Sequence, residues 1–264
     1  MKQILTIAGS DSGGGAGIQA DIKAISANGG FAMSAITSVT AQNTVEVTEA
    51  FDLPLSLIEA QLDAVFTDFE VASVKTGMLS SSDIVNRVTK KLQEYTPKYI
   101  VVDPVMISKS KFSLLKEEAI NSLKQELIPI ATLITPNIHE AELLAQQEIR
   151  SIEDAEQAAK SIAKLGCKAV LVKGGHLEDE KATDVLYYQG DWTFFESEWV
   201  ETKNTHGTGC TYSAAIATYL GQGKNLVEAI QSSKKYITGA IQHALDIGNG
   251  HGPTNHFFFM NSLK

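Results

Sequence analysis

The sequence predicts an α/β fold in which helices cover both faces of a mainly parallel sheet, with a small antiparallel hairpin attached. Short apolar and β-branched runs alternate with longer amphipathic segments, which is the pattern of repeated strand–helix units. Several of the short runs, such as ILTIA and YIVV, are apolar throughout. That composition is typical of strands buried on both faces of a parallel sheet. We therefore expect a three-layer α/β/α sandwich.

The expected elements follow one another in order along the chain. Residues 183–188 and 192–196 flank Gln189-Gly190-Asp191 and predict an antiparallel hairpin. No repeat, low-complexity tract or linker rich in Pro or Ser interrupts the pattern, so residues 1–264 are expected to form one domain. The predicted strands are 3–8, 35–39, 72–75, 99–102, 133–135 and 169–172, and the predicted helices are 18–28, 56–67, 82–95, 117–127, 152–165, 208–220 and 226–244.

The composition argues against several classes of partner. The 31 acidic residues outnumber the 22 Lys and Arg residues, for a net charge of −9, and no basic block is present. Neither nucleic acid nor an anionic membrane is therefore an expected partner. Cys167 and Cys210 lie far apart and form no zinc-binding pattern. The apolar run at the N-terminus is too short for a signal peptide, and no run approaches the ~18 apolar residues of a membrane span, so we expect a cytoplasmic protein.

The ligand site is expected beyond the carboxyl ends of the parallel strands, because ligands of such sheets bind there. The loops with the most unusual composition are two glycine-rich ones, 9–17 and 204–210. The other loops that follow predicted strands are 40–48, 76–80, 103–112, 136–140 and 173–180.

The first glycine-rich loop, Gly9 to Gly17, has five glycines in nine residues and precedes a predicted helix. Glycine lets a ligand approach the backbone closely, and a helix N-terminus attracts an anion. The glycine spacing does not match a dinucleotide-binding fingerprint, and no Gly-Lys-Ser/Thr makes it a phosphate-binding Walker loop. Close approach of a ligand is favoured over a simple turn-rich connection.

The second loop, NTHGTGC from Asn204 to Cys210, also leads into a predicted helix. Gly207 and Gly209 leave successive backbone N–H groups free to point at one oxyanion, and the helix dipole adds to the attraction. A thiol in the first helical turn is expected to have a lowered pKa and some thiolate character near neutrality. These are parts that phosphoryl transfer requires, although an isolated GTGC is also compatible with an inert buried cysteine.

Together, the motifs of these loops resemble the ribokinase-like kinases, and specifically the bifunctional hydroxymethylpyrimidine/phosphomethylpyrimidine kinases of thiamine biosynthesis. The resemblance covers nearly the whole chain, from Leu5 to about Pro253. It implies ATP-dependent phosphorylation of 4-amino-5-hydroxymethyl-2-methylpyrimidine and then of its monophosphate, with Mg²⁺, in a homodimer. The matching stretches are LTIAGSDSGGGAGIQADIK, TSVTAQNT, KTGMLS, VVDPVM, LITPNIHEAELL, LVKGGHLED, KNTHGTGCTYSAA and GHGPTNHF.

The resemblance also implies roles for individual residues. Cys210 stands where the wider superfamily has an aspartate base, and it is the implied base for the substrate hydroxyl. The implied anion hole is Gly207, Thr208 and Gly209, and the implied substrate contacts are Gly9, Ala16, Asp21, Gln42, Met78 and Val105. Asp21 is equally compatible with a surface helix carboxylate. His206, inside the anion loop, is expected to form a loop-shaping hydrogen bond rather than to bind phosphate.

The nucleotide and metal contacts are implied in the same way. Mg²⁺ takes hard oxygen ligands, so the metal pair is Asp103 at a strand end and Glu140 of the NxxE motif. Glu140 is also explained as an acid that offsets a helix dipole. The nucleotide contacts are Asn137, Lys173, Thr208 and Lys234, with Lys235 as an alternative to Lys234.

Two other functions fit the sequence. Pyridoxine and pyridoxal kinases share most of these motifs, but they tend to carry Met-Asp where this chain has Gln42-Asn43. A carboxamide matches the amino group and ring nitrogen of an aminopyrimidine, so Gln42 favours the pyrimidine. A non-catalytic nucleotide- or vitamin-binding protein is the second alternative. The sequence leaves open whether residues 107–112 close over the substrate.

Overall fold

The computed structural model describes residues 1–106, 117–174 and 181–263. Residues 107–112, considered above as a closing segment, lie outside the described residues, as do Gly175 and His176 of the loop after Lys173. Among the residues that are described, no helix is both long and apolar enough to cross a membrane.

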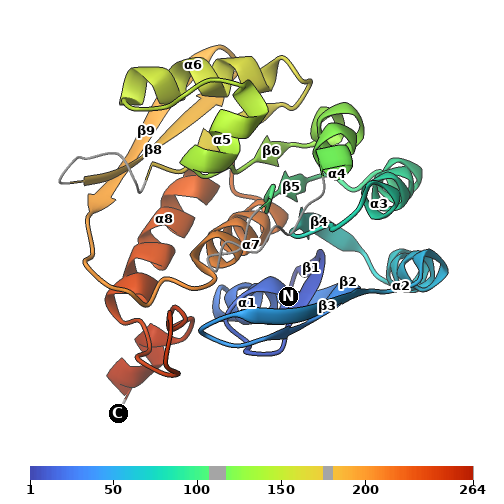
Figure 1. Cartoon of the computed structure of the whole chain (residues 1–264), viewed down its shortest axis with the longest axis horizontal. Helices are drawn as coiled ribbons and strands as arrows, with labels where there is room; N and C mark the ends of the chain where they lie inside the picture. The colour runs from blue at the N-terminus through green and yellow to red at the C-terminus, as the bar shows by residue number, and fades with distance from the viewer. Residues whose placement is uncertain (107–116, 175–180, 264) are drawn as a thin grey trace.

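One nine-stranded sheet runs through the molecule, in the order β3-β2-β1-β4-β5-β6-β7-β8-β9 (Figure 1). The strands from β2 to β7 in this order are parallel to their neighbours. Antiparallel strands lie at both edges, β3 on β2 and the β8–β9 hairpin on β7. The strands are β1 Gln3–Asp11, β2 Phe31–Gln42, β3 Val47–Asp52, β4 Val71–Thr76, β5 Ile100–Val102, β6 Leu133–Ile134, β7 Ala169–Val172, β8 Lys181–Tyr188 and β9 Asp191–Glu198.

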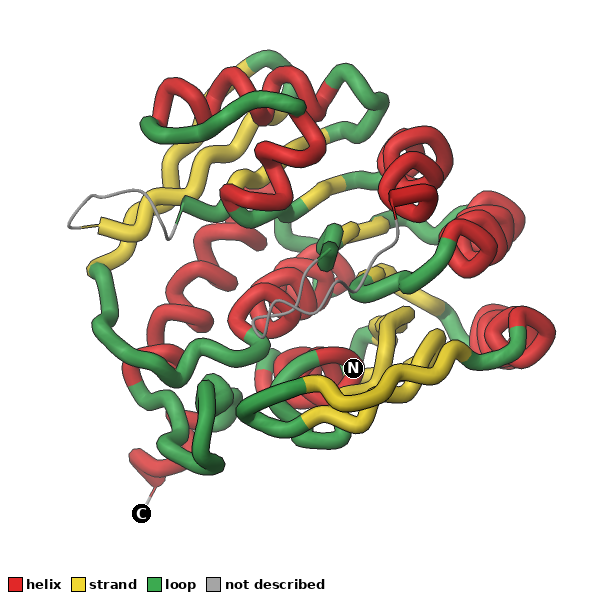
Figure 2. The backbone as a smooth tube through the Cα atoms, viewed as in Figure 1, coloured by secondary structure: helices red, strands yellow, loops and turns green. Residues whose placement is uncertain are grey.

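Helices cover both faces of this sheet, as the sequence predicts (Figure 2). Successive residues of the central strands point to opposite layers, as the pleat requires. Val101 and Leu171 pack with α1, α7 and α8, whereas Val102 and Val172 pack with the helices on the other face. The helices are α1 Gly17–Ala27, α2 Leu55–Asp68, α3 Ser82–Tyr95, α4 Glu117–Ser122, α5 Ile138–Ala145, α6 Ile152–Ala163, α7 Thr208–Gly221 and α8 Leu226–Gln242.

The expected three-layer sandwich with a mainly parallel sheet and an antiparallel hairpin is confirmed. Strand β3 was not predicted, because its sequence VTEAFD buries only Val47 and so lacks an apolar pattern. The predicted loops 9–17 and 40–48 begin too early, since β1 continues to Asp11 and β2 to Gln42. The helix predicted at 117–127 changes at Leu123 into a π-helical turn, followed by a 3-10 turn, Ile128–Ile130, that contains Pro129.

The C-terminal segment (residues 245–256) returns from α8 to the ligand end of the sheet. It bonds to the NTHGTGC loop, since His206 N–H donates to Gly252 O at 3.0 Å and Gly252 N–H donates to Asn204 Oδ1 at 3.0 Å. It also bonds to the turn between β2 and β3, where His251 N–H donates to Thr44 O at 2.9 Å. This segment therefore connects two loops that are far apart in the sequence.

The end of the C-terminal segment buries His256, which is 4% exposed. Its Nε2 lies 2.9 Å from Thr211 Oγ1 in the first turns of α7, and its carbonyl oxygen accepts a hydrogen bond from Tyr236. Burial lowers the pKa of His256 from 6.5 to about 4. The imidazole is therefore neutral in the folded protein near pH 7.

This burial predicts a loss of stability in acid. The unfolded chain takes up the His256 proton below about pH 6.5, whereas the folded protein does so only near pH 4. The loss therefore begins below pH 6.5 and amounts to about 2 kcal/mol at pH 5. The His256→Gln variant has no titrating group at this position, so only the wild type loses this stability. The difference in unfolding free energy between wild type and His256→Gln should therefore shrink by this amount between pH 7 and pH 5. Urea unfolding at both pH values measures it, and an unchanged deficit contradicts the prediction.

Candidate active site

Two cavities meet at the carboxyl ends of the parallel strands. The first, of about 170 Å³, is lined by residues of both glycine-rich loops and by side chains at the ends of the strands. The second, of about 440 Å³, lies toward β8, β9 and α8. Both are lined by Asn137, Lys173, Thr205, Thr208 and Gly209. The anion loop therefore borders both cavities, as a phosphoryl-transfer point must.

The N-terminus of α7 forms the floor of this meeting point. Gly207 is the N-cap residue and has a left-handed φ of 77°, which favours glycine. The first regular helical bond is Thr211 N–H to Gly207 O, so helix geometry leaves the N–H groups of Gly209 and Cys210 for a ligand. The helix begins where the sequence predicts, but Thr208 N–H, one of the groups expected in the anion hole, donates to Thr205 O at 3.3 Å.

The two glycine-rich loops touch at their glycines. A Cβ atom on Gly207 would overlap the carbonyl oxygen of Gly15, and one on Gly15 would overlap the His206 ring. Glycine is thus required at both positions by the approach of one loop to the other. The predicted close approach at the first loop is, at Gly15, an approach of the His206 and Pro253 side chains rather than of a ligand.

Asp11 organises the first loop from the end of β1. Its carboxylate accepts hydrogen bonds from the N–H groups of Gly13 (2.8 Å), Gly15 (3.0 Å) and Ala16 (2.8 Å), and lies 2.9 Å from His206 Nε2. Burial raises the pKa of Asp11, but the bonds from His206 and Ala16 outweigh it and leave the pKa below its ordinary value. Asp11 is therefore ionised, and the loop-shaping role expected for His206 agrees with this contact. Sequence reasoning missed Asp11, although it precedes the glycine run.

Cys210 lies in the first turn of α7 and lines the first cavity. The expected lowered pKa is wrong for this thiol. Burial raises the pKa of Cys210 to about 12, with further contributions from Asp21 and Asp103, and this outweighs the opposing effects of Lys75 and of a hydrogen bond from Gly17 N–H. The helix N-terminus alone does not compensate for desolvation of a thiolate, so the resting thiol is protonated.

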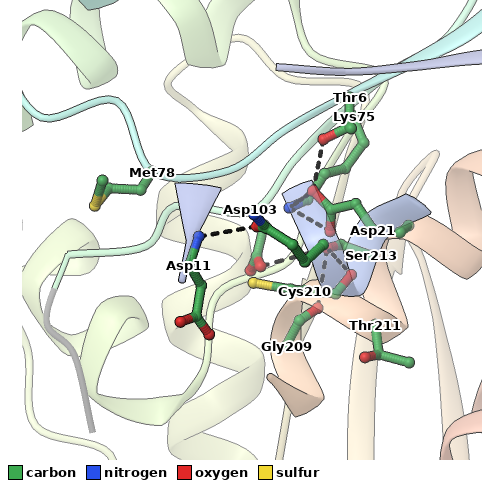
Figure 3. A network of polar contacts seen from close by, with 12 residues as sticks. Thr6, Asp11, Asp21, Lys75, Met78, Asp103, Gly209, Cys210, Thr211 and Ser213 are labelled. Carbon is green, nitrogen blue, oxygen red and sulfur yellow. Dashed lines mark hydrogen bonds and ion pairs between the residues drawn. The ribbon is translucent and has the colours of Figure 1, made fainter. Parts of the chain in front are cut away.

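A buried ion pair lies beside Cys210 (Figure 3). Lys75 Nζ is 2.9 Å and 3.0 Å from the two carboxylate oxygens of Asp21, and Thr6 Oγ1 donates to Asp21 at 2.5 Å. Both charged side chains are 0% exposed. Burial alone would lower the pKa of Lys75, but Asp21 raises it above the ordinary value, so the lysine stays charged.

Asp21 is therefore neither a surface carboxylate nor part of the lining of the first cavity. It lies behind Lys75, which lines the cavity in its place. Sequence reasoning missed Lys75. The available signal was a lysine near the end of an otherwise uncharged, buried strand, β4, because a charge in that position needs a buried partner.

The proposed metal pair, Asp103 and Glu140, lies at the meeting of the cavities with Lys173. Lys173 Nζ is 3.0 Å from Asp103 Oδ1, and Asp103 and Glu140 are 2% and 5% exposed. Within the described residues, no group of three His, Cys, Asp or Glu side chains is placed to hold a metal. Two carboxylates fit Mg²⁺, which usually keeps several waters and takes phosphate oxygens as further ligands.

Glu140 takes part in two hydrogen bonds that cap a helix. Its side chain accepts a hydrogen bond from Asn137 N–H at 2.8 Å, and Asn137 Oδ1 accepts one from Glu140 N–H at 2.9 Å, which is a capping box at the start of α5. Burial raises the pKa of Glu140 to about 7, with Asp103 adding to the effect and Lys173 opposing it. Glu140 thus lies in the first turn of a helix, as the helix-dipole interpretation requires, and burial is the main cause of its raised pKa.

Lys234 lines the second cavity from α8. Its Nζ is 2.8 Å from Asp184 Oδ2, which also accepts a hydrogen bond from Tyr212 at 3.0 Å, and Asp184 Oδ1 accepts one from Gly174 N–H at 3.1 Å. Lys235 is exposed and is not in the lining of this cavity, so of the two lysines it is Lys234 that faces it. Sequence reasoning did not identify Asp184, because nothing in the sequence connects it to Lys234, Tyr212 or Gly174.

The remaining predicted contacts are at the first cavity. Gly9, Ala16, Gln42, Met78 and Val105 all line it. A Cβ on Gly9 would come within 2.5 Å of the Met78 methyl carbon, so Gly9 makes room for that side chain. Of the residues predicted from the sequence, only Asp21 lines neither cavity, and Lys234 lines the second alone.

Residues 11–255 match the family model described as phosphomethylpyrimidine kinase. The chain is 48% identical to a hydroxymethylpyrimidine/phosphomethylpyrimidine kinase of Haemophilus influenzae over 98% of each chain. It is also 48% identical to a thiamine biosynthesis bifunctional protein of Geobacter sulfurreducens, covering 99% of this chain but only about half (53%) of that protein.

Two solved structures are similar as well. A pyridoxal kinase from Bacillus subtilis in complex with ADP has a TM-score of 0.92 and 39% identity, covering 98% of this chain and 99% of that one. A phosphomethylpyrimidine kinase from Clostridium difficile has a TM-score of 0.82 and 47% identity, covering 91% and 100%. The sequence is thus nearer to the second structure, although the backbone superposes better on the first.

The contact between the glycine-rich loops predicts a specific sensitivity at Gly207. Gly207→Ala combines a strained φ with overlap on Gly15, so it should lower both the free energy of unfolding and the affinity for ADP. Gly223→Ala is the matched control, because Gly223 has a φ of 98° with nothing within 4 Å of the added Cβ. The control should lose only about 1–2 kcal/mol, and keep its ADP affinity. Urea unfolding and calorimetry measure both quantities, and equal losses in the two variants contradict the prediction.

Proposed function

The chain belongs to the phosphomethylpyrimidine kinase family, and on that premise we propose that it phosphorylates 4-amino-5-hydroxymethyl-2-methylpyrimidine and then its monophosphate, using ATP. The observation that carries the proposal is the pair of cavities joined at the N-terminus of α7. The first cavity takes the pyrimidine, and the second takes the nucleotide. We propose that residues 1–264 act as one ribokinase-like kinase domain.

The nucleotide is held from the second cavity. Lys173 and Lys234 supply compact positive charges there, and Gly209 supplies a helix N-terminal N–H for the phosphates, with Thr208 beside it in the cavity lining. Asn137, in the lining of both cavities, adds a polar contact. The Bacillus subtilis pyridoxal kinase, a structural neighbour, is described as an ADP complex, which supports a nucleotide site in this fold.

Mg²⁺ would be held by Asp103 and Glu140, through water and phosphate oxygens. The ion supplies charge neutralisation for the transferred phosphoryl group when bound. The raised pKa of Glu140 supports this role, because a buried carboxylate with too little positive charge nearby favours an added cation.

The chain's own groups act on the acceptor. The N–H groups of Gly209 and Cys210 lie where negative charge moves during transfer, and preorganised donors of this kind stabilise that charge without reorganisation. Cys210 is the proposed base for the hydroxyl proton. As a base it acts in the thiolate form, after the thiol proton has passed to solvent water, and Lys75 is the buried cation whose charge favours that form.

The two reactions differ in their need for a base. The hydroxymethyl group carries a proton that must leave, whereas the phosphate acceptor of the second step is already ionised near neutral pH. Cys210→Ser should therefore lower kcat for the alcohol much more than kcat for the monophosphate, by tenfold or more, since general-base catalysis contributes roughly 10²–10⁴-fold. Separate ADP-release assays of the two steps measure this. Equal losses in both steps would remove Cys210 from the base role.

A pyridoxal kinase is the second candidate, supported by the close backbone match to the Bacillus subtilis enzyme of that description. Gln42 in the lining of the first cavity favours the pyrimidine instead, because its amide offers hydrogen bonds to an aminopyrimidine. A non-catalytic binding protein is disfavoured, since Asp103, Glu140 and Lys173 gather with the GTGC turn at one place.

The substrate assignment is tested by ADP release across the pyrimidine alcohol, its monophosphate and the three B6 vitamers. We expect the protein to turn over both pyrimidines, with a higher kcat/KM than for any of the B6 vitamers. A strong preference for pyridoxal would overturn the assignment. Stabilisation by ligands without any ADP release would instead favour the binding protein.

We also propose that the protein is a cytoplasmic homodimer. Val39 and Phe51 are directly opposite each other on β2 and β3, and they are 44% and 65% exposed. Val45 and Leu57 nearby are also exposed. An exposed apolar pair on an edge hairpin supports association through this surface. Light scattering should give twice the 28.4 kDa mass of the chain, and a monomer mass at micromolar concentration would contradict it.

A further inference from the structure

The side-chain amide of Gln42 lies between two polar groups in the first cavity. One end is 3.4 Å from His206 Nε2, and the other is 3.1 Å from Thr40 Oγ1. As placed, the amide nitrogen faces the histidine and the amide oxygen faces the threonine. The two ends of a carboxamide are nearly isosteric, so the hydrogen-bond network decides which is which.

Asp11 determines that His206 Nε2 carries a proton. Asp11 is ionised and lies 2.9 Å from His206 Nε2, so that nitrogen must carry its proton toward the carboxylate. A protonated Nε2 cannot accept a hydrogen bond from the Gln42 amide nitrogen. With nitrogen on the histidine side, two donors would face each other at 3.4 Å.

The hydroxyl proton of Thr40 also has a defined acceptor. The Thr40 hydroxyl has one proton and lies 2.9 Å from Ser10 O, which is nearer than the Gln42 amide at 3.1 Å. A backbone carbonyl can only accept, so the proton goes to Ser10 O and the Thr40 oxygen is left as an acceptor. An amide nitrogen facing Thr40 satisfies this oxygen, whereas an amide oxygen does not.

We propose that His206 and Thr40 together hold the Gln42 amide with its nitrogen on Thr40 and its oxygen beside His206. His206 and Thr40 are thus positioning residues for substrate selection, which rests on the proposed function. The amide oxygen presented to the first cavity accepts a hydrogen bond from a ligand donor, such as the 4-amino group of the pyrimidine. A ligand with an acceptor at that place meets an unpaired oxygen, which is strongly disfavoured in a buried site.

The amide orientation can be tested without any substrate. In the ligand-free protein, the Gln42 side-chain NH₂ protons should show a nuclear Overhauser effect to the Thr40 methyl group and none to the His206 ring protons. The reverse pattern overturns the proposal. This measurement does not depend on whether the protein is a pyrimidine kinase.

The role in selection is tested with the aminopyrimidine alcohol and its 4-oxo analogue, which replaces the donor by an acceptor. Wild type should prefer the amino compound in kcat/KM. Thr40→Val and His206→Leu free the amide to turn, so each should reduce this preference about tenfold, mainly through KM. Thr40→Ser and His206→Gln, which keep the hydroxyl and an N–H donor, are the matched controls and should retain it.

The outcomes separate the two proposals. Retention of the wild-type preference in both Thr40→Val and His206→Leu, or equal losses in the variants and their controls, overturns the positioning role. Failure of wild type to turn over either pyrimidine overturns the proposed function instead, and the amide measurement then still decides the orientation of Gln42.

Discussion

The approach of the two glycine-rich loops at Gly15 and Gly207 is the constraint on which the site depends. The loops begin some 190 residues apart in the sequence, yet a single added methyl group at either glycine would force them apart. Asp11 and His206 close the same contact with a charge-assisted hydrogen bond at 2.9 Å. This contact brings the first glycine-rich loop against the N-terminus of α7, so the loops proposed to bind the substrate and the transferred phosphoryl group share one junction.

Burial of charge is the second physical theme of the site. Lys75 and Asp21 are fully buried and paired; Asp21 raises the pKa of Lys75 and keeps it charged, whereas burial raises the pKa of Asp21 against the opposing effect of Lys75. Cys210 and Glu140 lack an equivalent partner, and burial raises their pKa values to about 12 and about 7. Added positive charge near these two groups, such as the Mg²⁺ proposed above, would favour their ionised forms.

The C-terminal segment (residues 245–256) contributes by contacts rather than by chemistry. It bonds to the anion loop at His206 and to the β2–β3 turn at Thr44, while His256 holds Thr211 in α7. The turn that follows Gln42 and the helix that carries Cys210 are thus both hydrogen-bonded to one segment. Displacement of either loop must therefore disturb hydrogen bonds of this one segment.

The sequence by itself determined the layers of the fold and most members of the site. Alternating apolar runs specify strands and helices locally, and glycines, a lysine or a carboxylate at a strand end are visible in a short window. Strand β3 was not predicted, because this edge strand has exposed faces and so carries no apolar pattern. Helix α5 was recognisable only from the Asn137–Glu140 spacing at its start.

Only the tertiary structure determined the exposure and the protonation of the charged side chains. Whether Cys210 is a thiolate, whether Asp21 reaches solvent and which lysine faces the second cavity all depend on burial by segments distant in the chain. Desolvation and ion pairing act through space, so a local motif such as GTGC cannot encode them. The same reason explains why Lys75, Asp11 and Asp184, each defined by a distant partner, became apparent only in the folded molecule.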